Sequence, residues 1–172
     1  MMLVPDCSIT TDQRKAIGAI CYDAGVSVQM QYSASSSGAY MSYVDNAMVD
    51  TFSYSNAIQG NRTDWSDIGD GLLEMINPNL DAGLPVVLGI EKQGATTGHA
   101  IVCDGYGYNY LTLYHHLNMG WSGTDDAWYN LPIIQGNYAN YDSVTCCIYN
   151  IFTAGTGEII SGRVTDSSGN PI

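Results

Sequence analysis

The sequence predicts an α+β fold, in which helices precede an antiparallel β-sheet. Two observations lead to this prediction. In the first half of the chain, apolar residues recur mostly at helical spacing, whereas in the second half short apolar segments are separated by turn-forming glycines. Helices and strands segregated in this way do not form the alternating units of a parallel sheet. We therefore expect one twisted antiparallel sheet over 85–152, with the helices packed beside it.

The first half of the chain is predicted to hold three helices and one strand. Ser8–Asp12 is rich in residues that cap helix N-termini, and Gly25 is a typical helix stop, so a helix is expected between them. Apolar residues alternate over Val26–Tyr32, which predicts a strand. The predicted helices are Gln13–Ala24, Gly38–Thr51 and Asp64–Leu80.

Five strands are predicted in the second half, each a short apolar segment bounded by turn signals. They are Pro85–Ile90, His99–Asp104, Tyr110–Leu117, Asp126–Leu131 and Val144–Phe152. The last residues, Ile160–Ile172, have a different pattern, a single strand followed by a turn. One strand cannot fold alone, so we expect this tail to be extended and to have no β-sandwich of its own.

Charge and composition exclude several classes of partner. The 172 residues suffice for one domain with a hydrophobic core. With 17 acidic and 5 basic residues the net charge is −12, so no basic patch for nucleic acid or an anionic membrane can form. No apolar segment approaches the roughly 18 residues of a membrane span, so no membrane insertion is expected. The acidic, tyrosine-rich and glycine-rich composition is typical of a secreted bacterial protein.

A histidine and an asparagine are placed at the ends of two predicted strands. His99 follows Gly98 at the start of one apolar strand, and Asn118 lies in the turn Asn118–Gly123 after the next strand. Imidazole exchanges protons near neutral pH, and an amide can hold its ring in one orientation. The pair is typical of the base and the orienting residue of a Cys-His-Asn site. The alternative for His99 is a hydrogen-bonded core histidine; we expect instead a His99–Asn118 hydrogen bond of about 2.6–3.2 Å.

The cysteines and acidic residues give little sign of a metal site. The 5 cysteines lack the spacing of a zinc site, and Cys21 and Cys103 are expected to be small buried hydrophobic residues. Cys7 precedes a predicted helix N-terminus, where the helix dipole lowers the pKa of a thiol, as a nucleophile requires. Neither Asp104 nor the pair Asp125–Asp126 has a metal-binding spacing, so no metal and no cofactor is expected.

A long stretch of the chain, roughly Ala16 to Leu131, resembles the streptopain-like (C10-type) cysteine peptidases of the papain-like superfamily. The resemblance implies a papain-like cysteine proteinase fold, a peptide or protein substrate, and secretion from a bacterium or a place on its surface. The matching segments, in the family's order and spacing, are Asp23–Tyr32, Ser35–Gly38, Phe52–Tyr54, Trp65, Leu84–Val86, Gly98–Ala100, Asp104–Gly105, Tyr114–Gly123 and Asp126–Tyr129.

The resemblance also implies roles for particular residues. His99 takes the position of the catalytic imidazole, and Asn118 that of the amide that orients it. The family usually carries Trp directly after this Asn, where this chain has Met119, so we expect a weaker cover over the His–Asn bond. His115 and His116 are consecutive in a strand and face opposite sides, so both are expected to be structural. The residues that support the site, by the resemblance, are Trp121, Gly98 and Gly120.

The resemblance places no nucleophilic Cys in this chain. In the family that Cys opens a long helix well upstream of the segment matched by Asp23–Tyr32, with an oxyanion-hole Gln further upstream, and only 22 residues precede Asp23 here. Cys7 is followed by Ser-Ile-Thr-Thr rather than by a small and apolar helix start, and no Gln precedes it. We therefore expect an incomplete papain-like fold, inactive on its own, with the missing N-terminal portion of the same protein, or another chain, as a candidate partner.

The tail resembles a second family. Ile160–Ile172 is similar to the first strand and turn of a carboxypeptidase-regulatory-like β-sandwich, which commonly follows secreted bacterial peptidase domains. We therefore expect residues 1–156 to be the C-terminal portion of a streptopain-like peptidase domain. Residues 157–172 would be a linker and the first strand of a truncated carboxypeptidase-regulatory-like domain.

Two functions remain open at this point. The first is a streptopain-like cysteine endopeptidase, of which this chain carries the His/Asn half. The second is a non-catalytic papain-like module that binds or supports other parts of a multidomain cell-surface protein. Met119 and the absent Cys helix favour the second function. A Gln followed by a Cys-led helix in the upstream genomic sequence would favour the first.

Overall fold

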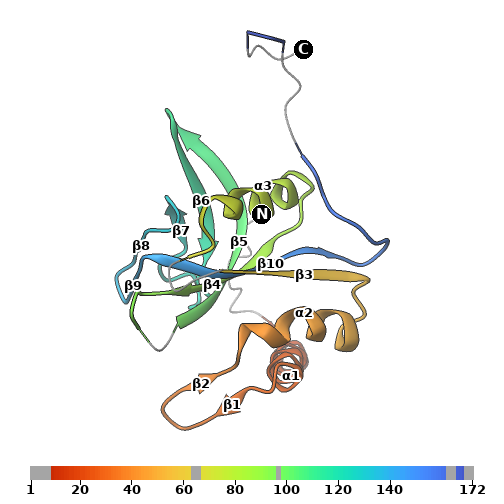
Figure 1. The fold of residues 1–172 in the computed structure, drawn as a ribbon. Coiled ribbons are helices and arrows are strands. Elements are labelled where there is room, and N and C mark those ends of the chain that lie inside the picture. The colour runs from red at the N-terminus through yellow and green to blue at the C-terminus, as the bar shows by residue number, and fades with distance from the viewer. Residues whose placement is uncertain (1–8, 63–66, 96–97, 162–165, 169–172) are drawn as a thin grey trace.

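The fold is organised around a six-stranded sheet in which all neighbouring strands are antiparallel (Figure 1). The computed structural model describes residues 9–62, 67–95, 98–161 and 166–168. It confirms the α+β class and the antiparallel sheet that the sequence predicts. In spatial order the strands are β3 (Asn56–Asn61), β10 (Ser143–Phe152), β4 (Val86–Glu91), β5 (Gly98–Asn109), β6 (Thr112–Asn118) and β7 (Ala127–Tyr129).

The first helix, α1 (Thr11–Ser27), begins where the capping residues predict. Thr10 is the N-cap, and its side chain accepts a hydrogen bond of 3.2 Å from the backbone N–H of Gln13. In return the Gln13 side chain accepts from the N–H of Thr10 at 2.8 Å. This capping box satisfies backbone donors that would otherwise lack a partner.

The strand predicted at Val26–Tyr32 is wrong, because α1 does not stop at Gly25. Gly25 is buried, and a Cβ on it would collide with the ring hydroxyl of Tyr32. This glycine therefore allows close packing rather than ending the helix. The only extended residues here are β1 (Gln31–Tyr32), paired with β2 (Ser37–Gly38).

The second predicted helix, Gly38–Thr51, is a series of short turns. Gly38 is extended in β2, so the helical segment starts later than predicted. It consists of a 3-10 turn, η1 (Met41–Tyr43), then α2 (Val44–Asn46) and a π-helical turn, η2 (Ala47–Thr51).

The third predicted helix, Asp64–Leu80, begins in residues that lie outside the described part of the chain. Its described part is a 3-10 turn, η3 (Gly69–Gly71), followed by α3 (Leu72–Asp81). The helix α3 lies on one side of the sheet, whereas α1 and α2 lie on the other (Figure 1).

The sheet has a core on each face, because helices cover both. One core joins α3 to the sheet and the other joins the α2 segment to it. The buried residues of the first core are Leu72, Ile76, Val86, Leu88, Ile90, Ile101, Cys103, Leu117, Met119, Ile134, Val144 and Cys147. Those of the second are Cys146, Ile148 and Ile151, with Met41, Val44, Met48, Tyr54, Ala57 and Val87 packed against them.

Four strands of the structure were missed or predicted too short, namely β3, β5, β8 and β9. The edge strand β3 was missed because its residues are largely polar and only half-buried. The strand β5 continues to Asn109, because Gly105 and Gly107 pair with β6 instead of forming a turn. A small hairpin, β8 (Ile134–Gln135) and β9 (Asn140–Tyr141), precedes β10.

The tail is only partly described. The backbone N–H of Ile159 donates to the side chain of Asn150 at 3.3 Å, whereas the side chain of Ile160 is 90% exposed. The described residues from 157 onward form no helix or strand, and the rest of the predicted Ile160–Ile172 strand lies outside the described residues. Within the ranges that are described, no helix combines the length and apolar character that a membrane span requires.

Candidate active site

His99 lies at the start of β5 on the α3 face of the sheet. It pairs with Ile90 of β4 and shares its face with Ile101. Its Nε2 is 2.7 Å from the backbone carbonyl oxygen of Met119. A carbonyl oxygen only accepts hydrogen bonds, so Nε2 must carry the proton. In the neutral ring, Nδ1 is then the basic nitrogen, which leaves it free to accept a proton from another group.

Two aromatic rings lie beside the imidazole of His99, which is half-buried. Trp121 stacks on it, with ring centroids 4.7 Å apart and planes inclined by 21°. Tyr141 is nearly parallel to the same imidazole at 6.4 Å. Tyr138 meets Trp121 edge-on at 6.3 Å. Trp121, which the resemblance implies as a supporting residue, thus lies against the ring of His99.

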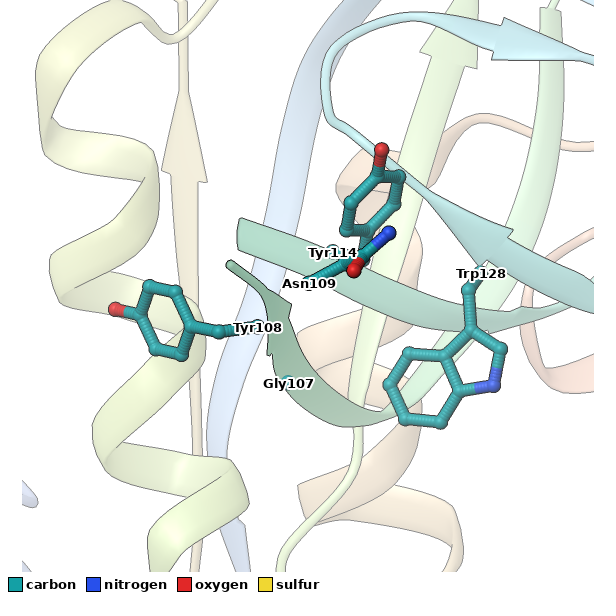
Figure 2. A pocket seen from close by; sticks show the side chains of 5 residues that line it. All are labelled: Gly107, Tyr108, Asn109, Tyr114 and Trp128. Atoms are coloured by element: carbon teal, nitrogen blue, oxygen red, sulfur yellow. The ribbon is translucent and has the colours of Figure 1, made fainter. Parts of the chain in front are cut away.

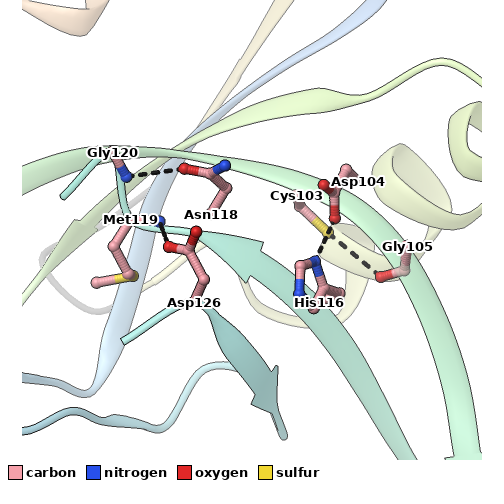
Figure 3. Close-up of polar contacts among 8 residues, drawn as sticks. All are labelled: Cys103, Asp104, Gly105, His116, Asn118, Met119, Gly120 and Asp126. Carbon is pink, nitrogen blue, oxygen red and sulfur yellow. Dashed lines mark hydrogen bonds and ion pairs between the residues drawn. The ribbon is translucent and has the colours of Figure 1, made fainter. Parts of the chain in front are cut away.

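The predicted hydrogen bond between His99 and Asn118 is not formed, and that prediction is wrong. Asn118 lies directly opposite Val102, three residues along β5 from His99. Because side chains alternate along a strand, His99 and Asn118 face opposite sides of the sheet. The Asn118 Oδ1 instead accepts from the backbone N–H of Gly120 at 2.9 Å (Figure 3).

The backbone of Met119 takes the orienting position that we expected Asn118 to hold. Its carbonyl accepts from His99, and its N–H donates to Oδ1 of Asp126 at 2.7 Å (Figure 3). The Met119 side chain is fully buried in the α3-face core. Sequence reasoning missed this role because every residue type carries a backbone carbonyl, so no side chain identifies it.

The two supporting glycines each meet a backbone requirement. Gly120 has φ of +75°, a conformation that side chains disfavour, and it directly follows Met119 in the turn after β6. A Cβ on Gly98 would lie 2.5 Å from the backbone oxygen of Ile90. Gly98 thus lets β5 approach β4 beside His99.

None of the described thiols is placed to act with His99. Cys7, the one cysteine that the sequence places at a helix start, lies outside the described residues. Burial raises the pKa of Cys103 to about 12, and it also raises the pKa values of Cys146 and Cys147. Cys21 is exposed on α1, so the expectation that it is buried is wrong, whereas Cys103 is buried. A thiolate is the reactive form of cysteine, so the buried thiols are unreactive.

The other two histidines face opposite sides of β6, as their consecutive positions predict. His115 is buried, its Nε2 is 2.9 Å from Oδ1 of Asn77, and burial lowers its pKa to about 4. His116 lies on the other face, where its Nδ1 is 2.6 Å from Oδ1 of Asp104 (Figure 3). Trp128 lies beside His116, at a ring distance of 5.3 Å.

The acidic pair Asp125–Asp126 binds backbone groups. Asp126 holds Met119, while Asp125 accepts from the backbone N–H groups of Asn137 and Tyr138 at 2.9 and 3.1 Å. These hydrogen bonds hold the pKa of Asp125 below its usual value. In the described part of the chain, no group of three or more His, Cys, Asp or Glu side chains is arranged to hold a metal ion.

A shallow recess of about 410 Å³ lies along the β5–β6 hairpin, away from His99 (Figure 2). Trp128 and Tyr114 stand beside it, with the Asn109 side chain between them (Figure 2). None of its lining residues contacts His99 through a hydrogen bond or ring contact found in the described residues. The lining residues are Gly107, Tyr108, Asn109, Tyr114 and Trp128.

Comparison with known proteins decides the family. A model of the peptidase C10 family matches residues 1–129. The chain belongs to the peptidase C10 family. It is 36% identical over 126 residues to streptopain of Streptococcus pyogenes, and the match covers 72% of this chain and 29% of streptopain. It is 28% identical over 133 residues to the thiol protease/hemagglutinin PrtT of Porphyromonas gingivalis, covering 74% of this chain and 14% of PrtT.

The fold is similar to that of a solved peptidase. The interpain A cysteine protease of Prevotella intermedia superimposes with a TM-score of 0.69 at 23% identity, covering 83% of this chain and 58% of interpain A. The chain therefore shares its fold with a larger protein. It spans 29% of the length of the streptopain sequences that it matches.

Proposed function

We propose that this chain supplies the histidine side of a cysteine endopeptidase site, with His99 as the general base and then the general acid. The observation that carries the proposal is the hydrogen bond from His99 Nε2 to the Met119 carbonyl. It leaves Nδ1 free to take the proton of a thiol, and the stacked Trp121 restricts the motion of the ring and its access to water.

The proposed reaction proceeds in two steps. His99 Nδ1 takes the proton of a cysteine thiol, and the thiolate attacks the substrate peptide carbonyl. The C–N bond breaks, the leaving amine takes the proton from Nδ1, and a thioester remains. In the second step Nδ1 takes a proton from water, and the hydroxide attacks the thioester carbonyl. The C–S bond breaks, the carboxylic acid product leaves, and the thiolate takes the proton back from Nδ1.

The thiol in this proposal comes from a segment other than the described residues. Cys103, Cys146 and Cys147 are buried, with raised pKa values, and their hydrogen bonds within the described chain do not involve His99. We assign no catalytic role to Cys7, because Ser-Ile-Thr-Thr follows it in place of the small and apolar helix start that the resemblance implies. The isolated chain would then be inactive.

Asn118 acts indirectly in this proposal. Its side chain accepts from the N–H of Gly120, which belongs to the same peptide unit as the Met119 carbonyl. Hydrogen bonds at both ends of a peptide unit strengthen each other and fix its plane. Asn118 is therefore a positioning residue that reaches His99 through the backbone.

The remaining proposals concern the setting of the site. The substrate is a peptide or protein, and the protein works outside a bacterial cell or on its surface, as its composition and its bacterial relatives suggest. Residues 1–156 belong to the peptidase domain, and 157–172 form a linker and the start of a carboxypeptidase-regulatory-like domain. The exposed Ile160 supports a partner for this tail, since an unpaired strand edge tends to recruit one.

A non-catalytic module is the second candidate, and the buried state of the three described sheet thiols favours it. The experiment that separates the candidates is peptide cleavage by the full-length protein from its own organism. His99→Ala should lower cleavage by on the order of 10⁴–10⁶. His116→Ala is the matched control, because His116 lies on the neighbouring strand and faces the other side of the sheet from His99. This substitution should leave the cleavage rate within about threefold of the wild type. A full-length protein that folds and cleaves no peptide would support the module.

A further inference from the structure

We infer that Asp126 is a positioning residue for His99, which acts by holding the backbone of Met119. The backbone of Met119 makes a hydrogen bond to each of these two side chains. The carboxylate of Asp126 accepts from the Met119 N–H at 2.7 Å, and the carbonyl of Met119 accepts from His99 at 2.7 Å. The two hydrogen bonds of Met119 do not depend on any assigned activity, whereas their use in catalysis rests on the proposed function.

The position of Asp126 in the chain explains why it can hold this turn. Asp126 directly precedes β7, whose first residue, Ala127, pairs with Leu117 of β6. The carboxylate is thus anchored to the sheet next to the end of β6, where Met119 begins the turn toward Trp121. A hydrogen bond from the Met119 N–H to a fixed carboxylate limits rotation about the Met119 backbone and so directs its carbonyl.

A charged acceptor suits this task. Hydrogen bonds to an ionised carboxylate are shorter and about twice as strong as those between neutral groups. Asn118 adds a second, neutral hydrogen bond to the following N–H, that of Gly120. Two acceptors therefore hold the two successive N–H groups of this turn, and the carbonyl between them is directed at His99.

The neighbouring carboxylates have other tasks, which makes the role of Asp126 separable. Asp125 holds the 137–138 backbone, and Asp104 bonds to His116 on the opposite face of the sheet. Asp104 is therefore a matched control, a carboxylate that orients a different histidine. A merely structural role for Asp126 would alter stability in the same way as any lost hydrogen bond, without loosening the ring of His99.

The test is the exchange of the ring Nε2–H of His99 with solvent water, measured by NMR on the purified, isotopically labelled chain at the same pH for every variant. In the wild-type chain this proton should be bonded and slow to exchange. Asp126→Ala should speed its exchange by at least about tenfold, because the Met119 carbonyl loses its fixed direction. Asp126→Asn keeps a neutral acceptor of the same shape and should give a smaller acceleration, on the order of threefold.

The Asp104→Asn variant is the control for this measurement. Asp104→Asn should change the ring signals of His116 and leave those of His99 as in the wild type. Folding of each variant is checked by circular dichroism, and if Asp126→Ala does not fold, Asp126→Asn decides. An unchanged His99 exchange rate in a folded Asp126 variant would overturn the inference. An inactive full-length protein would overturn the proposed function alone, because this measurement needs no activity.

Discussion

Substituting Gly98 by alanine should separate β5 from β4 beside the candidate base. A Cβ at this position would lie 2.5 Å from the backbone oxygen of Ile90 and 2.8 Å from Cγ of Glu91. The first of these atoms belongs to the strand backbone and cannot rotate away, so the strands must move. Overpacking of this kind costs about 1–3 kcal/mol. We expect the upper half of that range, because the displaced atoms take part in the pairing of Ile90 with His99.

Urea unfolding followed by circular dichroism measures this effect. Gly18→Ala is the matched control, because Gly18 lies in α1 with nothing within 4 Å of a new Cβ. That substitution should stabilise the helix by about 0.5–1 kcal/mol, since alanine favours helix more than glycine does. A Gly98→Ala chain that is as stable as the wild type, within about 0.5 kcal/mol, would show that the two strands are not held as closely as described.

Two further predictions concern buried groups. Met119→Ala should destabilise the chain by about 2–5 kcal/mol in urea unfolding, because the side chain is fully buried. The NMR signals of the His99 ring should stay unchanged, because the backbone carbonyl of residue 119 remains. Loss of the hydrogen bond from His99 Nε2 would contradict this prediction. Burial lowers the pKa of His115 to about 4, below its value of about 6.5 in an unfolded chain, so the unfolded state binds the proton first. Stability should therefore fall by up to about 3 kcal/mol as the pH drops from 6.5 to 4, and His115→Gln should reduce that dependence; an equal fall in both chains would refute the assignment.

Much of the fold could be predicted from local sequence patterns. The capping residues before α1 and the apolar segments of β4 and β10 led to the right elements, because capping and burial leave a clear pattern over a few residues. The strand β3 left no such pattern, since it is a polar edge strand. Gly25 was misread as a helix stop because its real role, contact with Tyr32, depends on how the chain folds back.

In the candidate site, too, local sequence patterns reveal only some of the contacts. The motifs that carry His99 and Trp121 can be recognised in the sequence, and the structure places these two side chains against each other. The contact with Asn118 could not, because the register of β5 and β6 decides which face each side chain takes. The true partner is the backbone carbonyl of Met119, and the carboxylate that holds it, Asp126, lies beyond a turn in the sequence.

The measurement that tests the account most directly is peptide cleavage by the purified 172-residue chain. A fluorogenic peptide and casein serve as substrates, with the Cys7→Ala and His99→Ala variants as controls and folding verified by circular dichroism. We predict no cleavage at a rate typical of cysteine peptidases, because a base without a positioned thiol forms no thioester. Robust cleavage that both substitutions abolish would make Cys7 the nucleophile and would contradict the account.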